Sequence, residues 1–70
     1  MNLFQTMQAV KIANEALDDH GRAGSVRSQP YEHVDAITDE KSVVVDVMLD
    51  ATADKPEELL AVSPADLVPL

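Results

Sequence analysis

Residues 42–50 alternate between two kinds of side chain, and this pattern constrains the fold more than any other feature of the sequence. One side of the run carries Val43, Val45, Val47 and Leu49, and the other side carries Val44, Asp46, Met48 and Asp50. A period of two with a majority of β-branched residues predicts a strand whose first side is buried. The two aspartates indicate that the second side meets water, as an antiparallel sheet allows.

The length of the chain limits what can surround this strand. Seventy residues without a cysteine form one domain with a small core, and neither a disulfide nor a thiolate zinc site can reinforce it. Packing or a partner must therefore supply the stability. We expect a short N-terminal segment, residues 1–7, followed by a single small β-barrel domain over residues 8–70.

Four further segments have the pattern of short strands. They are residues 9–13, 25–29, 58–63 and 67–70. Gly21 and Gly24, the only glycines, stand where the backbone must turn sharply and then enter the second of these strands. Ser63 can cap a helix and Pro64 suits a first helical position, so one helical turn is expected before the last strand. The polar residues 30–41 are expected to form a long excursion between two strands.

The first part of the chain, residues 3–19, has two interpretations. As a helix, it has a broken apolar stripe made of Leu3, Met7, Val10, Asn14 and Leu17. As a strand followed by a polar loop, it has Val10 and Ile12 alternating with smaller or polar residues. Local propensity favours the helix, whereas the short strands that follow favour a strand, because their sheet needs a first member. We expect the strand and keep a helical N-terminal segment as the alternative.

The order of these segments resembles a small barrel of Src-homology-3 (SH3) type. The residues Val10-Lys11-Ile12 and Gly21-Arg22-Ala23-Gly24-Ser25-Val26 look like the KOW-type version of that barrel, and residues 62–70 look like its helical turn and last strand. The resemblance covers roughly residues 8–70. It implies an all-β fold: an SH3-like barrel of about five antiparallel strands with a short one-turn helix before the last strand. Met7-Gln8 stand where the family usually has a glycine before the first strand.

The charge of the chain argues against nucleic acid as its partner. The net charge is −8, and the excess lies in residues 32–70, which contain ten acidic and two basic residues. Binding to phosphates needs clustered cations, which are largely replaced by acids here, so the RNA binding of KOW-type domains is not expected. Lys11, Arg22 and Arg27 are expected to balance nearby acids rather than to bind phosphate.

No segment predicts a membrane span or a targeting signal. The first six residues lack the basic and apolar regions of a signal peptide, and no apolar run approaches the length of about 20 residues that a membrane span needs. We expect a cytoplasmic location, or one within a virion or another soluble assembly.

One polar cluster has the side chains of a metal site. Asp18, Asp19 and His20 are adjacent, and with His33 or Glu32 they contain possible ligands for a divalent cation. Adjacent loop residues rarely converge on one ion without a third ligand fixed by geometry. A polar turn before Gly21 is the expected role, and we predict no metal and no cofactor.

Catalysis has little support in the sequence. A triad of Ser25, His20 and Asp35 can be drawn, but no motif positions an oxyanion hole or a nucleophile elbow. A domain of 7.6 kDa also has little room for a concave substrate pocket. The chain is therefore not expected to be an enzyme.

Apolar residues in excess of one small core indicate a binding surface. We select Leu3, Phe4, Met7, Val44 and Met48 as candidate interaction residues, because they precede the barrel or lie on the outer side of its best strand. Phe4 and Tyr31 are the only aromatic residues, too few for a groove that binds polyproline. We expect a protein-interaction or assembly module that binds a protein partner or itself, as in an accessory or structural protein of a phage or bacterial assembly. The alternative is an acidic regulator that occupies the basic groove of a nucleic-acid-binding protein.

Overall fold

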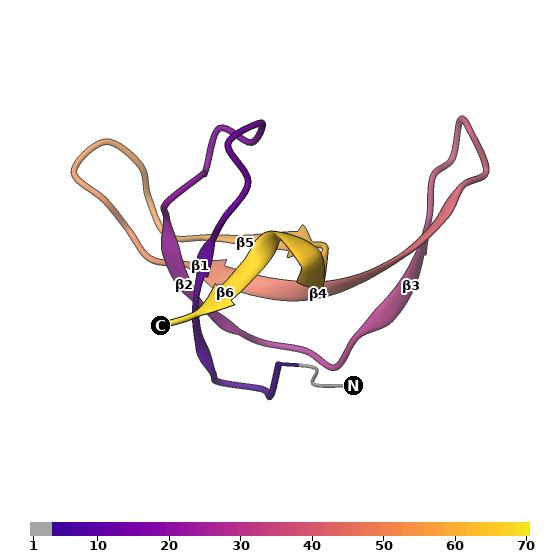
Figure 1. Cartoon of the computed structure of the whole chain (residues 1–70). Helices are drawn as coiled ribbons and strands as arrows, with labels where there is room; N and C mark the ends of the chain where they lie inside the picture. The colour runs from indigo at the N-terminus through magenta and orange to yellow at the C-terminus, as the bar shows by residue number, and fades with distance from the viewer. Residues whose placement is uncertain (1–3) are drawn as a thin grey trace.

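A computed structural model describes residues 4–70 and shows an all-β chain with six antiparallel strands in one open sheet (Figure 1). The strands are β1 (Ala9–Ile12), β2 (Ala23–Val26), β3 (Tyr31–Val34), β4 (Lys41–Leu49), β5 (Glu58–Val62) and β6 (Leu67–Pro69). The 3₁₀ turn η1 (Pro64–Asp66) lies just before β6 and has Ser63 as its N-cap, with Ala65 N donating to Ser63 Oγ. The expected one-turn helix before the last strand is therefore confirmed.

β4 organises the sheet, because three strands pair with it. The strand order is β3-β4-β2-β1-β6, and β5 also pairs with β4. β2 pairs with the C-terminal part of β4, whereas β3 pairs with its N-terminal part, at Tyr31↔Val44. The segment between β2 and β3 stays beside β4, since Arg27 N donates to Asp46 O over 2.8 Å. β2 and β3 thus run as one interrupted strand along β4.

The core lies on one side of this sheet and consists of aliphatic side chains from five strands. Its buried members are Val10, Ile12, Val26, Val45, Val47, Leu49, Val62 and Leu67. Phe4 is half-buried and packs against them. The predicted alternation of β4 is confirmed for Val45, Val47 and Leu49 but is wrong for Val43, whose exposed fraction is 52%. Val43 lies beyond the end of the core, where β4 pairs with β3 but no longer with β2 or β5.

Gly21 has the role expected from the sequence, whereas Gly24 lies within β2 rather than at a turn before it and is required for a different reason. Gly21 has φ +84°, which an L side chain rarely adopts, and it turns the chain into β2. Gly24 lies against β4 so closely that a Cβ atom there would be 2.5 Å from Met48 O. Packing of β2 on β4 therefore requires a residue without a side chain at this position.

The structure confirms the expected first strand over its alternative, a helical N-terminal segment, and corrects two other expectations. Residues 9–12 form a strand, and residues 4–19 contain no helix, because Gln5 to Gln8 form a turn in which Gln8 N donates to Gln5 O. Part of the expected excursion over residues 30–41 is β3, so the sheet has six strands rather than about five. The sheet is also open where a closed barrel was expected, because β6 at one edge pairs with neither β5 nor β3 at the other. β3 and the start of β4 turn away from the remaining strands (Figure 1).

We call residues 31–44, which comprise β3, the turn at 35–40 and the first part of β4, the arm. Figure 1 shows the arm extending away from the body that the other strands form. The molecule is accordingly elongated, with principal extents of 36 × 27 × 18 Å. The arm contributes Val44 to the buried residues but no member to the central core cluster.

Candidate functional site

The arm is a two-stranded ribbon. β2 and β5 pair with β4 only from Val45 onwards, so residues 41–44 pair with β3 alone among the described strands. An isolated ribbon of this kind is marginally stable in water unless other contacts hold it. The arm therefore depends on specific bonds at its base and its tip.

Asp46 holds the base of the arm. Its backbone N–H donates to Ser28 Oγ over 3.0 Å, its carbonyl accepts from Arg27 N, and its carboxylate accepts from Tyr31 Oη over 2.7 Å. The hydrogen bond to the Asp46 carboxylate raises the pKa of Tyr31 above its usual value. The backbone of Asp46 thus fixes the segment between β2 and β3, and its side chain fixes the start of β3.

Asp35 shapes the tip of the arm. Its carboxylate accepts hydrogen bonds from Ile37 N over 2.8 Å and Thr38 N over 3.0 Å, and its backbone N–H donates to Glu40 O. These bonds from Thr38 and Ile37 hold the pKa of Asp35 below its usual value. Asp39 has φ +62°, a conformation that aspartate tolerates better than most residues, and it closes the turn. The tip is consequently ordered by its own hydrogen bonds.

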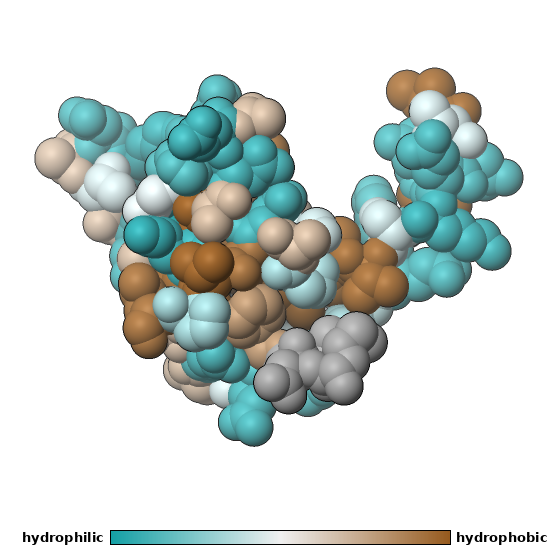
Figure 2. Space-filling view, in the orientation of Figure 1, coloured by the Kyte–Doolittle hydropathy of each residue, from teal (hydrophilic) through white to brown (hydrophobic). Residues whose placement is uncertain are grey.

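Apolar side chains on the arm are exposed. Ile37 is 94% exposed at the tip, where Figure 2 shows an apolar cap above a polar turn. Val34 and Val43 lie on one face of the ribbon according to the register and are each about half exposed. Ile37 is therefore exposed to solvent on an ordered turn, and it takes no part in the core of the chain. Such exposed apolar groups on a rigid element are typical of binding surfaces.

The arm is also acidic. Its charged residues are Glu32, Asp35, Asp39, Glu40 and Lys41. The single lysine, Lys41, pairs with Val34 at the end of the ribbon that adjoins the tip. The turn at 35–40 carries three acidic side chains around Ile37, and Lys41 next to it offsets one of them.

The interaction residues selected from the sequence are dispersed. Val44 was expected on an exposed outer face, but it is buried at the base of the arm, opposite Tyr31. Phe4 packs against the core, Met7 is 61% exposed, and Met48 is half-buried on the side of β4 away from the core. Leu3 lies outside the described residues.

Sequence reasoning missed the apolar residues of the arm, which are Val34, Ile37 and Val43. Val34 and Ile37 were placed in a polar connecting segment, and Val43 was placed in the core. A usable signal was present, because Ile37 is an apolar residue between polar neighbours in a segment that no core needed.

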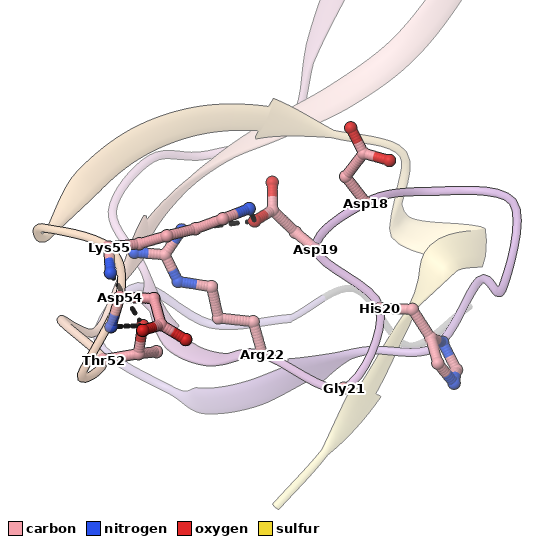
Figure 3. A pocket seen from close by; sticks show the side chains of 8 residues that line it. All are labelled: Asp18, Asp19, His20, Gly21, Arg22, Thr52, Asp54 and Lys55. Carbon is pink, nitrogen blue, oxygen red and sulfur yellow. Dashed lines mark hydrogen bonds and ion pairs between the residues drawn. The ribbon is translucent and has the colours of Figure 1, made fainter.

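A second feature is a hollow of about 290 Å³ between the β1–β2 and β4–β5 connections (Figure 3). Arg22 is buried at its side, where it donates to Asp50 O, Pro56 O, Glu58 Oε1 and Asp19 Oδ1. These bonds tie the β4–β5 connection to the start of β2. Arg22 thus has a structural role that extends the expected charge balance.

Asp18, Asp19 and His20, the possible metal ligands considered in the sequence, all line the hollow, but they do not converge on one point. Asp19 pairs with Lys55 and Arg22, and the bond to Lys55 is the main cause that holds the pKa of Asp19 below its usual value. The His20 side chain points away from Asp19, and the Asp18 carboxylate lies apart from the ion pairs of Asp19 (Figure 3). Within residues 4–70, no three histidine, cysteine or acidic side chains are placed to hold a metal ion.

The drawn triad is also dispersed. Ser25 lies on β2 and accepts a hydrogen bond from Arg27 Nε, whereas the Asp35 carboxylate serves the tip of the arm. Over the same described range, no helix is long and apolar enough to cross a membrane.

Comparison with known proteins gives no family for this chain. No protein-family model matches it, and no curated protein or solved structure is significantly similar to it. The arm, defined by its geometry alone, is therefore the candidate functional site.

Proposed function

We propose that this chain is a non-enzymatic protein-interaction module whose arm binds another protein, as an accessory or structural component of a phage or bacterial assembly. The observation that carries the proposal is the 94% exposure of Ile37 on a turn held by the Asp35 carboxylate. A turn that is ordered before binding loses little conformational entropy on binding, so an apolar residue on it makes an efficient anchor.

The charge around Ile37 indicates the chemistry of the partner. The acidic residues Asp35, Asp39 and Glu40 flank the isoleucine, and the sequence has no cationic residue between Asp35 and Glu40. Complementary charge speeds association and suppresses wrong partners. We therefore expect an apolar pocket with lysine or arginine at its rim, on a protein found in the cytoplasm or within the same assembly.

The acidic tip also supports a second candidate function, a regulator that occupies the basic groove of a nucleic-acid-binding protein. In that case the charges themselves supply the recognition, and Ile37 contributes little. The two functions differ in which substitution matters: the loss of Ile37 for the assembly module, or neutralisation of Asp39 and Glu40 for the regulator.

The architecture behind the arm supports assignment to the SH3-like barrels as part of the same proposal. The order β5, β4, β2, β1, β6 and the position of η1 before the last strand agree with the barrel expected from the sequence. The arm is then an extension of two barrel strands beyond the core. Binding through an extended hairpin needs neither a cofactor nor a catalytic residue.

The test compares the proteins captured by the wild-type chain with those captured by Ile37→Asp. Purified chains are immobilised and exposed to a lysate of the source organism, and a captured protein is identified, purified and titrated against each variant. We expect Ile37→Asp to raise the Kd of that complex at least tenfold. Leu17→Asp, at an exposed leucine in the β1–β2 connection, is the matched control and should leave the Kd unchanged.

A second pair of variants separates the two candidate functions. Asp39→Asn with Glu40→Gln removes two of the three acidic charges of the tip and keeps Ile37 and the Asp35 carboxylate that holds the turn. If this double variant abolishes the complex while Ile37→Asp binds normally, the regulator is correct and the apolar anchor is wrong. Equal binding by all variants would exclude the arm as the binding element.

A further inference from the structure

β5 lies at an edge of the sheet, and its exposed side chains are apolar. One side of β5 pairs with β4, and within residues 4–70 no strand pairs with its other side (Figure 1). Leu59 is 55% exposed, Leu60 is 36% exposed, and Ala61 is also exposed. Charged residues, prolines or bulges commonly protect the edge strands of native sheets, because an open edge binds further strands. Residues 59–62 contain neither a charged residue nor a proline, so β5 presents an unprotected apolar edge.

The register shows which backbone groups of β5 point to the free side. The carbonyl of Asp46 in β4 accepts a hydrogen bond from the segment that follows β2. Because backbone groups alternate in direction along a strand, Val47 directs its own groups to β5, where its register partner is Leu60. Leu60 therefore bonds toward β4. The N–H and C=O groups of its neighbours, Leu59 and Ala61, point to the free side.

The free edge of β6 does not offer such donors. Leu70 N donates to Ala9 O on β1. By the same alternation, Leu67 and Pro69 direct their backbone groups away from β1. The Leu67 N–H already donates to Pro64 O, and a proline has no N–H. β5 of one copy therefore cannot pair with β6 of another, which excludes a head-to-tail chain through these two edges.

The sequence of β5 is complementary to itself in an antiparallel pairing. A two-fold axis perpendicular to the sheet can place Leu60 opposite Leu60 of a second copy. Leu59 then lies opposite Ala61 of the second copy, and this contact occurs twice, as an isologous interface requires. The outward N–H and C=O groups of Leu59 and Ala61 form the hydrogen bonds of both contacts. The two Leu60 residues form a non-hydrogen-bonded pair with their Cα atoms about 4.5 Å apart, so their exposed side chains cover each other.

The acidic residue of β5 stays away from its counterpart in this register. Glu58 falls opposite Val62 of the second copy, so the two Glu58 residues lie four positions apart, about 13 Å along the strands. That separation exceeds the Debye length of about 10 Å at 0.1 M salt. Each Glu58 carboxylate is also paired with Arg22 of its own chain over 3.1 Å. A register with Leu59 opposite itself would halve the separation of the two carboxylates.

We propose that β5 of a second copy of this chain pairs antiparallel with β5, with Leu60 opposite Leu60, and joins the two sheets edge to edge. The contact is smaller than the area of about 800 Å² that each partner buries in a stable interface, so we expect a weak, reversible dimer. The arm extends beyond the Val62 end of β5, because Val62 pairs with Val45 and the arm precedes Val45. The two arms of the dimer therefore lie at opposite ends of the joined sheet.

Cysteine cross-linking tests the register, because the natural chain contains no cysteine. Leu60→Cys places two thiols on Cα atoms about 4.5 Å apart, which suits a disulfide. Leu59→Cys is the matched control, since its two thiols are offset by two positions, about 7 Å along the strands, in addition to the spacing between the strands. Under mild oxidation we expect Leu60→Cys to form a covalent dimer at least tenfold faster than Leu59→Cys. Equal or reversed rates would overturn the proposal.

Sedimentation equilibrium of the whole chain over a wide concentration range tests the dimer itself. We expect a reversible dimer of twice 7.6 kDa. Ala61→Pro removes the outward N–H and leaves the bonds of β5 to β4 in place, as proline at a sheet edge allows. It should raise the dimer Kd about tenfold or more, because two hydrogen bonds are lost in each dimer.

Val34→Pro is the matched control at the free edge of β3. Asp35 N donates to Glu40 O across the arm, so the Val34 N–H points outward like that of Ala61. This variant should dimerise like the wild type, and so should Ile37→Asp, whatever the arm binds. Circular dichroism establishes that each variant keeps its sheet. A chain that stays monomeric, as expected if an extended strand of a different protein occupies β5, overturns the proposal, and so does a Kd that Ala61→Pro leaves unchanged.

Discussion

Tyr31 and Asp46 are joined by a hydrogen bond of 2.7 Å from the phenol to the carboxylate, two positions along β4 from the register partner of Tyr31. The bond spans the point where the arm leaves the body. Because the chain contains one tyrosine and no tryptophan, the absorbance of the protein near 295 nm reports on Tyr31 alone.

The first prediction concerns the titration of Tyr31. Its pKa is raised by the bond to Asp46, so its phenolate should form at a higher pH than that of a model tyrosine, about 10. The folded-state pKa is higher than the unfolded one, so the stabilisation is present below pH 10 and is lost as the pH rises through the folded value. Absorbance near 295 nm against pH measures the midpoint.

Asp46→Asn is the control for this titration. It removes the negative charge and leaves the backbone bonds to Ser28 and Arg27 in place. The midpoint should fall toward that of a model tyrosine in this variant. A midpoint that is normal in the wild type, or unaffected by the substitution, would contradict the bond at the base of the arm.

The second prediction concerns acid and the tip of the arm. The pKa of Asp35 is lowered by the hydrogen bonds from Thr38 and Ile37, so its folded-state value is below the unfolded value. The stabilisation is therefore complete above the unfolded pKa of about 4 and is lost as the pH falls through the folded value. Hydrogen exchange at the amides of Ile37 and Thr38 should accelerate relative to acid-corrected intrinsic rates in that range.

Asp35→Ala reproduces the acid effect at neutral pH, since it removes the acceptor for both amides. We expect fast exchange at Ile37 and Thr38 and unchanged exchange at core strands such as β1. Protection of both amides in Asp35→Ala would show that the turn is held by other bonds.

The core could be predicted from the sequence where local pattern and burial coincide. Val45, Val47 and Leu49 are buried as their alternation requires. The same pattern fails at Val43, because alternation gives the side of a strand on which a residue lies but not how far the core extends along it. The N-terminal part of β4 extends beyond its pairing with β2 and β5, which begins at Val45, and no local feature of the sequence marks this boundary.

The arm was missed because β3 forms through its partner rather than through its own propensity. Tyr31 and Val34 favour a strand, but only four residues are involved and Glu32 and His33 separate the two, so the local signal is weak. The strand forms because β4 offers it a free edge. Arg22 was missed as a buried residue for a similar reason. Its burial is possible only because Asp50, Pro56 and Glu58 converge on it from a distant connection.

The third prediction concerns this buried guanidinium. Arg22→Met removes the donor for two backbone carbonyls and two carboxylates, and we expect a loss of about 2–3 kcal/mol in the free energy of unfolding. Urea denaturation followed by circular dichroism measures the change. Glu58→Gln affects one half-exposed partner and should cost less than about 1 kcal/mol. Equal losses in the two variants would contradict a central role for Arg22.

The fourth prediction compares the two glycines. In Gly24→Ala the new Cβ atom meets backbone atoms of β4, with Met48 O at 2.5 Å and Leu49 Cα at 3.1 Å, and neither can move without displacing the strand. We expect a loss of about 3 kcal/mol, at the upper end for an overpacked core. Gly21→Ala is the matched control, because no atom lies within 4 Å of its added Cβ and the cost comes only from φ +84°. That cost is about 1–2 kcal/mol. Urea denaturation of both variants decides the order: if Gly21→Ala is the more damaging, the close approach of β2 to β4 is not what requires glycine at position 24.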